Sequence, residues 1–508
     1  MAVNDIADVA AFELGALDDL TDIEKQMYLS DAMYKSSITN TEYQASKDNE
    51  TVSSKHYIIP KKCNRSVDIT EKMSVIPGTT NELNFIINTK MDFITYTYMY
   101  RTFSRYKVKE EYKDNVQISW CHNLGHNNID SIELIIDNDS KKTITNTWLD
   151  IYSQFFISKD HRKSYRMSIC DDKYGKGWTK GSISKQDGKY WGTELDSITV
   201  KVPLPLFSRK TPFPILLSSQ SSITIKIKYK TKLSQLLKMR MRADENSEWK
   251  EVPVKCYFLQ GMSESEADYT LPDVPELYSN YSRITEEEQN FWKDLASQNP
   301  NGYRFYYDDI IINTYDKLYT AAEPFDGTLS SKTPSKAIFW VAQNESGLKL
   351  NNYSNYTTNS LDRSKGNHPV SKVSIKHGGD SSRCKDMDIS HFDEMMSYHR
   401  FPSVPYEKGY GALVFSYNTT SVDADVGPIF DLVKTNLNLS LQEGGDVSDE
   451  IFSKANEKID IKKILLASSD KSDVAKNKYK IYIFTLVIKQ LQFSIADKVK
   501  VNDGKKKS

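Results

Sequence analysis

Short runs in which apolar and polar residues alternate recur along most of this chain. The period of two is clearest in residues 223–230, where isoleucine and tyrosine alternate with threonine and lysine, and it returns in residues 94–100, 116–120 and 132–136. Such alternation is typical of β-strands with one face on a core. Turn residues such as Pro77-Gly78 separate the runs. Short strands between turns predict β-sandwiches rather than alternating strands and helices.

Further apolar runs predict more strands along the rest of the chain. They occupy residues 252–259, 310–313, 337–343, 412–417 and 479–491. The chain of 508 residues is long enough for two or more domains, each with its own core.

A polar, acidic stretch that ends near prolines divides the predicted strands into two sets, which is typical of a domain boundary. We therefore predict a first domain at residues 51–262, a linker at 263–274 and a second domain at 275–497. Within the second domain, residues 344–400 are rich in Asn, Ser, Gly, Lys and Asp. We expect this stretch to form mostly long surface loops.

The two ends of the chain differ in charge. Residues 1–50 carry eleven acidic residues against three lysines, and Thr21-Asp-Ile-Glu24 has the spacing of a helix capping box. We predict an N-terminal arm with one short helix, which either docks on a partner or neighbouring subunit or packs on its own domain. Residues 498–508 form a basic tail with five lysines, expected to be solvated unless it contacts an acidic surface.

One further helix is predicted among the strands of the first domain. Residues 147–150 have a helix-capping spacing. Apolar residues then recur at helical spacing and form one broad stripe, made of Trp148, Ile151, Tyr152, Phe155 and Phe156. We expect this helix to cover an open end of the sandwich.

Composition excludes several classes of protein. The formal net charge is −1, so no overall field steers the chain to nucleic acid. No apolar run is long enough to predict a membrane span, and we expect no secretory signal. Five scattered cysteines, at positions 63, 121, 170, 256 and 384, favour a reducing compartment over a disulfide framework.

Candidate chemistry is sparse. Cys121, His122 and His126 are the best metal-like cluster, but the sequence offers no second ligand pair at zinc spacing. The glycines at residues 175, 177 and 181 lack the Gly-Lys-Ser/Thr ending of a phosphate-binding loop. We interpret both groups as structural, and predict no metal site and no cofactor.

Two pairs of adjacent acids are candidate catalytic carboxylates: Asp308 with Asp309, and Asp393 with Glu394. Glycoside hydrolysis needs two carboxyl groups that face one cleft, whereas neighbours on a strand point to opposite faces. We therefore expect these acids to be solvated and predict no catalytic residue.

A proline-rich segment precedes the strand at 223–230. Pro203, Pro205, Pro212 and Pro214 exclude a helix or a central strand, so residues 202–214 should be an extended loop or an edge. The segment resembles the "LPLPFFFSRDTG…LP" block of major capsid proteins from iridoviruses and other nucleocytoplasmic large DNA viruses.

Six other blocks resemble the same family, in family order. They are the arm from about residue 12, residues 116–136, residues 146–172, residues 337–344, residues 404–417 and the strand at 479–493. The chain also departs from the family pattern. Residues 208–212 read Ser-Arg-Lys-Thr-Pro instead of Ser-Arg-Asp-Thr-Gly, and residues 426–430 replace the family's "HPSGxxNxSR" block. The resemblance is therefore to a divergent member.

The resemblance implies an all-β fold of two tandem eight-stranded jelly-roll β-sandwiches, a double jelly-roll, with a few short helices. It also implies a structural protein without enzyme activity. Its homotrimer would be a pseudo-hexameric capsomer that tiles an icosahedral capsid over an internal membrane and is assembled in the host cytoplasm. Implied partners are other copies of the chain, minor capsid proteins and penton proteins, with no specific nucleic acid.

Two alternatives remain open from the sequence. One is a capsid-like scaffolding protein or minor capsid paralogue with the same fold. The other is a carbohydrate-binding β-sandwich, which would need clustered aromatic residues or facing carboxylates on one sheet surface.

Overall fold

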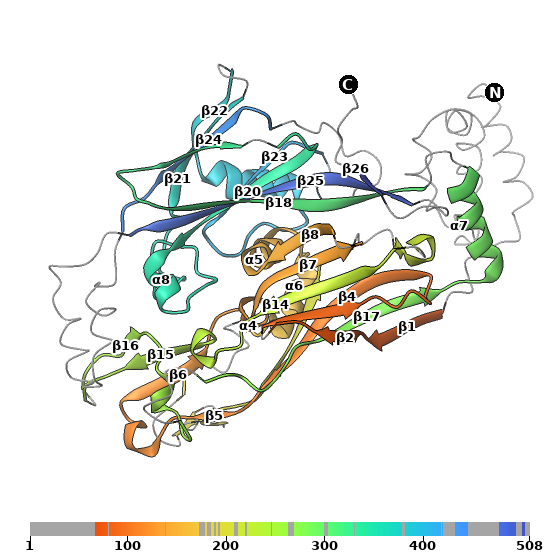
Figure 1. Cartoon of the computed structure of the whole chain (residues 1–508). Coiled ribbons are helices and arrows are strands. Elements are labelled where there is room, and N and C mark those ends of the chain that lie inside the picture. Colours follow the sequence, from red (N-terminus) through yellow and green to blue (C-terminus); the bar gives the residue numbers. More distant parts are fainter. Residues whose placement is uncertain are drawn as a thin grey trace, which may run out of the picture.

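The computed structural model describes residues 67–493 and 500–502, with internal gaps at residues 80, 138, 172–177, 180–183, 187–188, 192–193, 208–211, 219–220, 245, 263–268, 299–302, 330, 378–380, 418, 420–431 and 445–476. The predicted acidic arm, the glycines of residues 175–181 and most of the basic tail lie outside the described residues. Figure 1 shows two β-sandwiches side by side.

The first sandwich consists of two antiparallel sheets and a small third sheet. The first sheet has the order β1 (Val67–Lys72), β17 (Glu276–Arg283), β4 (Phe93–Phe103) and β12 (Ile198–Leu204), with β13 (Phe213–Pro214) also paired to β4. The second has the order β2 (Ser74–Pro77), β3 (Glu82–Ile86), β14 (Ile223–Tyr229), β7 (Ile129–Ile136) and β8 (Asp139–Thr145). The third joins β16 (Lys250–Val252), β15 (Leu237–Met241) and β6 (Val116–Trp120).

The second sandwich also has two antiparallel sheets. One has the order β18 (Tyr303–Tyr319), β25 (Tyr479–Phe493), β20 (Ser335–Asn344) and β23 (Tyr410–Val414), with β26 (Lys500–Asn502) paired to β25. The other has the order β19 (Phe325–Leu329), β24 (Thr435–Leu441), β21 (Val370–His377) and β22 (Ser381–Asp388). The first sheet faces the first sandwich, and β8 contacts β18 directly.

Helices and short strands complete the described residues. The helices are α4 (Leu124–Asn127), α5 (Asn146–Phe155), α6 (Lys159–Ser168), α7 (Glu286–Gln298), α8 (Glu345–Lys349), a π-helical turn at His391–Met395 and α9 (Met396–Arg400), and 3-10 turns occupy Glu110–Tyr112, Ile215–Ser218, Leu233–Gln235 and Cys256–Phe258. The short strands are β5 (Tyr106–Lys107), β9 (Ser184–Gln186), β10 (Lys189–Trp191) and β11 (Glu194–Leu195). None of these helices is long and apolar enough to cross a membrane.

Most predicted strands are present. The alternating run at 223–230 is β14, whose isoleucines are buried and whose lysines lie toward solvent. The proline-rich segment contributes β12, an edge strand of its sheet, as the missing N–H of Pro203 requires. The fold is therefore the double jelly-roll that the sequence predicts.

The run at residues 337–343 differs from the others because it is apolar at consecutive positions. Every residue of β20 is buried. Ile338 and Trp340 point into the core of the second sandwich, whereas Phe339 and Val341 belong to the core that the first sandwich shares. A strand covered on both faces needs no alternation, which explains this sequence.

The predicted domain boundary is wrong. Residues 276–283 were assigned to the second domain, but β17 pairs with β1 and β4, so it completes a sheet of the first sandwich. The change between sandwiches falls later, around α7 and before Tyr303. The local composition of residues 263–274 indicated a boundary there. Which sheet a strand belongs to depends instead on its pairing partners, which lie far away in the sequence.

Three other expectations need correction. Residues 252–259 contain the end of β16 and a 3-10 turn rather than one strand. Residues 344–400 hold helices and two strands, and many of their polar side chains are buried. The N-cap of α5 is Thr145, whose hydroxyl accepts a hydrogen bond from the Trp148 amide, two residues before the predicted cap. Within the tail, residues 500–502 pair with β25.

The double-sided burial of β20 gives a stability prediction. Phe339 is fully buried and contacts aromatic rings from both sandwiches. We expect Phe339→Ala to lower the free energy of unfolding by about 3–5 kcal/mol, because it leaves a cavity in a close-packed core. The exposed Tyr398 offers a matched control. Tyr398→Ala should change the free energy of unfolding by less than about 0.5 kcal/mol. Denaturant unfolding measures the effect of both variants. Equal effects would contradict the burial of Phe339 between the two sandwiches.

Candidate functional site at the junction of the two jelly rolls

Helix α5 provides the apolar part of the junction between the sandwiches. Trp148 lies with its ring centroid 5.3 Å from that of Phe339 and 5.5 Å from that of Phe484, both in the second sandwich. Phe155 lies 5.2 Å from Phe339 and 4.9 Å from Phe401. The apolar stripe predicted from the sequence therefore covers the neighbouring sandwich, rather than the open end of its own.

A buried hydrogen-bond network surrounds Asp150 on the same helix. Its Oδ1 lies 2.6 Å from His126 Nδ1 and accepts a 2.9 Å bond from Asn123 Nδ2. Its Oδ2 accepts a 3.0 Å bond from the Tyr356 hydroxyl. His126 Nε2 lies 2.8 Å from the Tyr165 hydroxyl. Burial, together with Asp150, raises the pKa of Tyr356 well above its usual range, so the hydroxyl remains a donor.

An ionic network joins the sandwiches beside Asp150. Arg363, from the second sandwich, donates to Asp171 Oδ1 through Nη2 at 2.7 Å, and its Nη1 lies 2.8 Å from Glu407 Oε1. Arg166 of α6 pairs with the other oxygen of Asp171. Tyr406 lies under the guanidinium of Arg166, with 4.7 Å to the ring centroid. Arg166 and Arg363 both contact Asp171, and Arg363 also contacts Glu407, so the four side chains form one network across the junction.

The predicted loop at 344–400 supplies many of these contacts. Asn351 Nδ2 donates to the carbonyls of Ser234 and Leu237, at 2.6 and 2.7 Å, in the first sandwich. In the opposite direction, Asn127 of the first sandwich donates from Nδ2 to Ser354 Oγ of the second, at 2.7 Å. Side-chain amides and hydroxyls can be buried when they are hydrogen-bonded, so a polar composition here does not mean solvent exposure.

One glycine is required for this arrangement. Gly409 has a φ of 104°, and a Cβ there would lie 1.9 Å from the backbone oxygen of Tyr356. The backbone at residue 409 can therefore pack this closely against Tyr356 only if the residue has no side chain.

The structure does not gather the candidate metal cluster into a set of ligands among the described residues. His126 is held by Asp150 and Tyr165, whereas His122 Nε2 lies 3.1 Å from Lys238 Nζ, a cation that a metal would not adjoin. Burial raises the pKa of the Cys121 thiol to about 12. The part of the chain that the structure describes holds no group of three or more potential metal ligands.

The candidate catalytic carboxylates are separate. Asp308 and Asp309 on β18 pair with different lysines, Lys336 at 3.0 Å and Lys489 at 2.8 Å. Asp393 and Glu394 lie on the π-helical turn, where burial, then Glu394, raises the pKa of Asp393 to about 6. The expectation of full solvation is wrong for Asp309, which is buried, and for Asp393, which is half-buried.

Comparison with known proteins agrees with this architecture. Residues 57–252 match the family model described as the major capsid protein N-terminus. The structure is similar to PBCV-1 VP54, with a TM-score of 0.58 and 11% identity over 87% of this chain and 98% of that one. It is also similar to the Faustovirus major capsid protein, with a TM-score of 0.54 and 10% identity over 92% and 98%. No curated protein sequence matches the chain.

The fold is a double jelly-roll, as it is in these viral capsid proteins. With the match over its first sandwich, the chain resembles the major capsid proteins of large DNA viruses.

Sequence reasoning missed the junction residues Asp150, Asp171, Tyr356, Arg363 and Glu407 as a group. Each lies in a different segment, and no motif or period connects them. The only local signal was the helical stripe of α5, whose partner lies nearly 200 residues away in Phe339.

The ionic network should make stability depend on pH. Burial raises the pKa of Glu407 to about 7, although Arg363 opposes the shift. Because its folded pKa exceeds the unfolded one, the contribution of this group to stability is greatest below about pH 4.5 and is lost as the pH rises through about 7.

We expect Glu407→Gln, which cannot ionise, to remove that loss. Denaturant unfolding of both proteins from pH 4 to 8 should show the parent losing stability relative to the variant as pH rises. The exposed Glu287 of α7 gives a control, since Glu287→Gln should leave the curve near the parent's. If the stability curves of the parent and of Glu407→Gln run parallel over this pH range, the prediction is wrong.

Proposed function

We propose that three copies of this chain form a pseudo-hexameric capsomer that tiles an icosahedral capsid. The observation that supports this proposal is the buried junction, which fixes the two sandwiches as one rigid tile. Three such tiles supply six similar sandwiches, so a single protein could occupy a six-neighbour lattice position. A junction free to bend would not give the repeated geometry that a closed shell needs.

Self-association is expected for a family of shell proteins. We infer that the neighbouring copies are joined by many weak contacts repeated around the shell, not by one deep pocket. Minor capsid proteins, penton proteins and an internal membrane beneath the shell are the further partners that we propose, with assembly in the host cytoplasm.

We also propose a division of labour along the chain. Residues 67–283 and 303–493 would be the two lattice-forming sandwiches, and the acidic arm at 1–50 would make contacts beyond its own sandwich. The polar residues 344–400, by contrast, would not all lie on the outer surface of the capsomer, because many of them are buried in the junction.

The oligomeric state tests the proposal. Size-exclusion chromatography with light scattering on the purified chain should give about three times 58.3 kDa. A hexagonal particle outline in negative-stain electron microscopy should accompany that mass. A stable monomer of 58.3 kDa at micromolar concentration would count strongly against a capsomer.

A scaffolding or minor capsid paralogue would have the same fold and could also trimerise. Quantitative mass spectrometry of purified mature virions separates the roles. The main shell protein should be the most abundant virion protein, whereas a scaffold should be absent and a minor protein scarce.

A further inference from the structure

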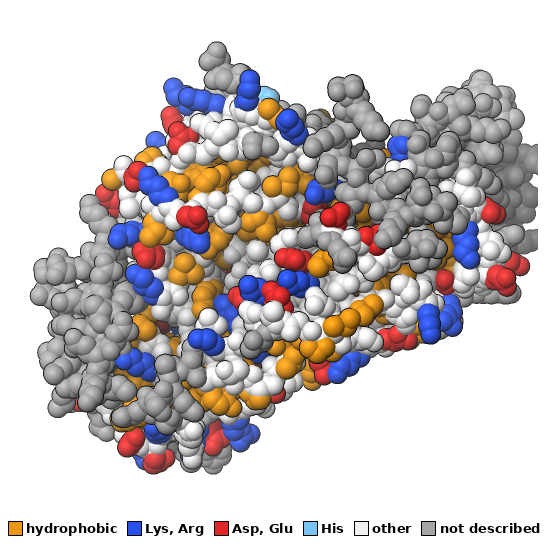
Figure 2. All heavy atoms as spheres, viewed as in Figure 1, with side chains coloured by type: hydrophobic (Ala, Val, Ile, Leu, Met, Phe, Trp, Pro, Cys, Tyr) orange, Lys and Arg blue, Asp and Glu red, His pale blue; other side chains and the backbone are white. Residues whose placement is uncertain are grey.

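An open groove follows the junction on the outside of α5. One cavity of about 320 Å³ has walls from both sandwiches, with Trp148, Phe156 and Leu486 among its apolar residues. A second of about 350 Å³ lies against β4 and β12, beside Tyr96 and Tyr98. Both cavities are bordered by Tyr152, Pro205 and Phe207, so they adjoin one another, and we call the pair the groove. Figure 2 shows apolar side chains gathered over the sheet around β4, with charged residues beside them.

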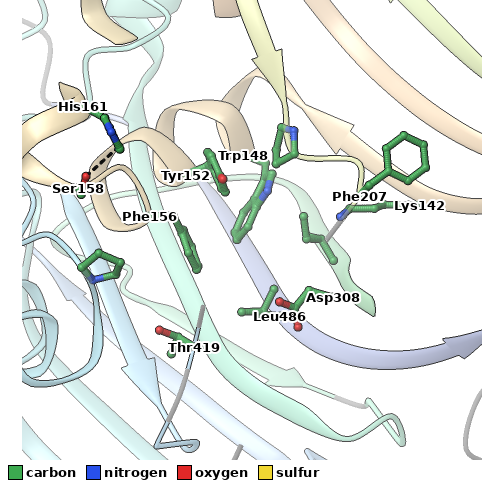
Figure 3. A pocket seen from close by; sticks show the side chains of 13 residues that line it. Lys142, Trp148, Tyr152, Phe156, Ser158, His161, Phe207, Asp308, Thr419 and Leu486 are labelled. Atoms are coloured by element: carbon green, nitrogen blue, oxygen red, sulfur yellow. Dashed lines mark hydrogen bonds between the residues drawn. The ribbon is translucent and has the colours of Figure 1, made fainter. Parts of the chain in front are cut away.

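Lys142 is the unusual residue of this groove. It is only 7% exposed, and Figure 3 shows it beside Phe207 on one wall, on the same side as Asp308. Its ammonium group makes one long hydrogen bond, 3.4 Å to the Leu206 carbonyl. Burial lowers its pKa, as expected for a cation taken out of water.

The carboxylates nearest to Lys142 are committed elsewhere. Asp308 binds Lys336 Nζ at 3.0 Å, and Asp309 binds Lys489 Nζ at 2.8 Å. Among the described residues, no carboxylate forms an ion pair with Lys142. A buried cation without a paired anion is costly, and a carboxylate that enters the groove would offset part of that cost, beyond what Asp309 and Asp308 already offset.

The groove as a whole attracts an acidic, apolar ligand. Besides Lys142, its ionisable lining includes Lys201 and His161, against the single paired carboxylate of Asp308. Its remaining surface is mostly aromatic, proline and aliphatic. A matching peptide would therefore alternate carboxylates with large apolar side chains.

We propose that the groove binds residues 12–24 of this chain, from the same or a neighbouring copy. That segment, Phe-Glu-Leu-Gly-Ala-Leu-Asp-Asp-Leu-Thr-Asp-Ile-Glu, has five carboxylates and no basic residue. Five large apolar side chains are interleaved with them. A carboxylate of this segment pairs with Lys142, and the leucines and the phenylalanine cover the aromatic walls.

The start of the described chain is close enough for this contact. Thr70 of β1 pairs with Asn280, which pairs with Tyr96 of the groove, so the two residues are about 10 Å apart across two strand spacings. Val67 lies three residues further along β1. The 42 residues from 25 to 66 are long enough to reach the groove of either the same or an adjacent copy, since an extended chain spans about 3.3 Å per residue.

Hydrogen–deuterium exchange of the full-length protein tests the proposal. Amides of residues 12–24 should exchange at least tenfold more slowly than free peptide. Lys142→Met, which keeps the bulk and removes the charge, should return them at least tenfold toward the free rate. Lys163 of α6 is exposed and does not line the groove, so Lys163→Met is the matched control and should leave them protected.

A variant in the arm tests the same contact without changing a buried residue, so it remains informative if Lys142→Met impairs folding. Asp18→Asn combined with Asp19→Asn leaves both sandwiches intact and should raise exchange in residues 12–24 and at Tyr96 and Tyr152. Unprotected arm amides in the parent, or protection that survives both variants, would overturn the proposal. Groove protection that appears only in virions, with an unprotected arm, would assign the groove to another protein.

Zero-length carbodiimide cross-linking gives a second readout, because it joins only amines and carboxylates in contact. Lys142 should be recovered linked to Asp18, Asp19, Asp22 or Glu24. Mixing ¹⁴N- and ¹⁵N-labelled copies shows whether the link forms within one chain or between two. Light scattering on the same sample reports the oligomeric state separately, so a trimer with an unprotected arm overturns this proposal without overturning the proposed capsomer.

Discussion

The burial of α5 from two sides is the constraint on which the rest of the structure depends. Trp148 and Phe155 lie on a helix of the first sandwich, yet their ring partners belong to the second. A buried aromatic side chain removes about 150–250 Å² from water, which at about 25 cal/mol per Å² corresponds to roughly 4–6 kcal/mol each. Separating the sandwiches would expose several such rings together, so neither sandwich is independent of the other.

Apolar contact alone would hold the sandwiches together without fixing their angle. The polar groups around Asp150 add that fixation, because each buried donor or acceptor left unpaired costs about 1–3 kcal/mol. Tyr356 reaches Asp150, and Arg363 reaches Asp171, only in one relative placement of the sandwiches. A small rotation would break several of these bonds at once. The junction is therefore more specific than its buried area suggests.

The sequence predicted the fold class because alternation is a local property. The strand at residues 223–230 and the edge position of Pro203 could be inferred from neighbouring residues alone. The junction could not, since it depends on which strands meet across the fold. Asn351 and Asn352 look like loop residues until their partners, the Leu237 carbonyl and Glu251, are known. The boundary failed for the same reason, because β17 is assigned by pairing with β4 and not by composition.

This difference also explains how the chain has the same fold as capsid proteins with which it shares 11% or less of its residues. A sandwich core accepts many apolar side chains as long as the period and the total volume are kept. A buried ion pair or hydrogen bond does not tolerate exchange of one partner alone, since the other is left unpaired. We therefore expect sequence change in such a protein to be easy within each sandwich and coupled in pairs across the junction. Arg363 and Asp171 would have to change together, although 192 positions separate them.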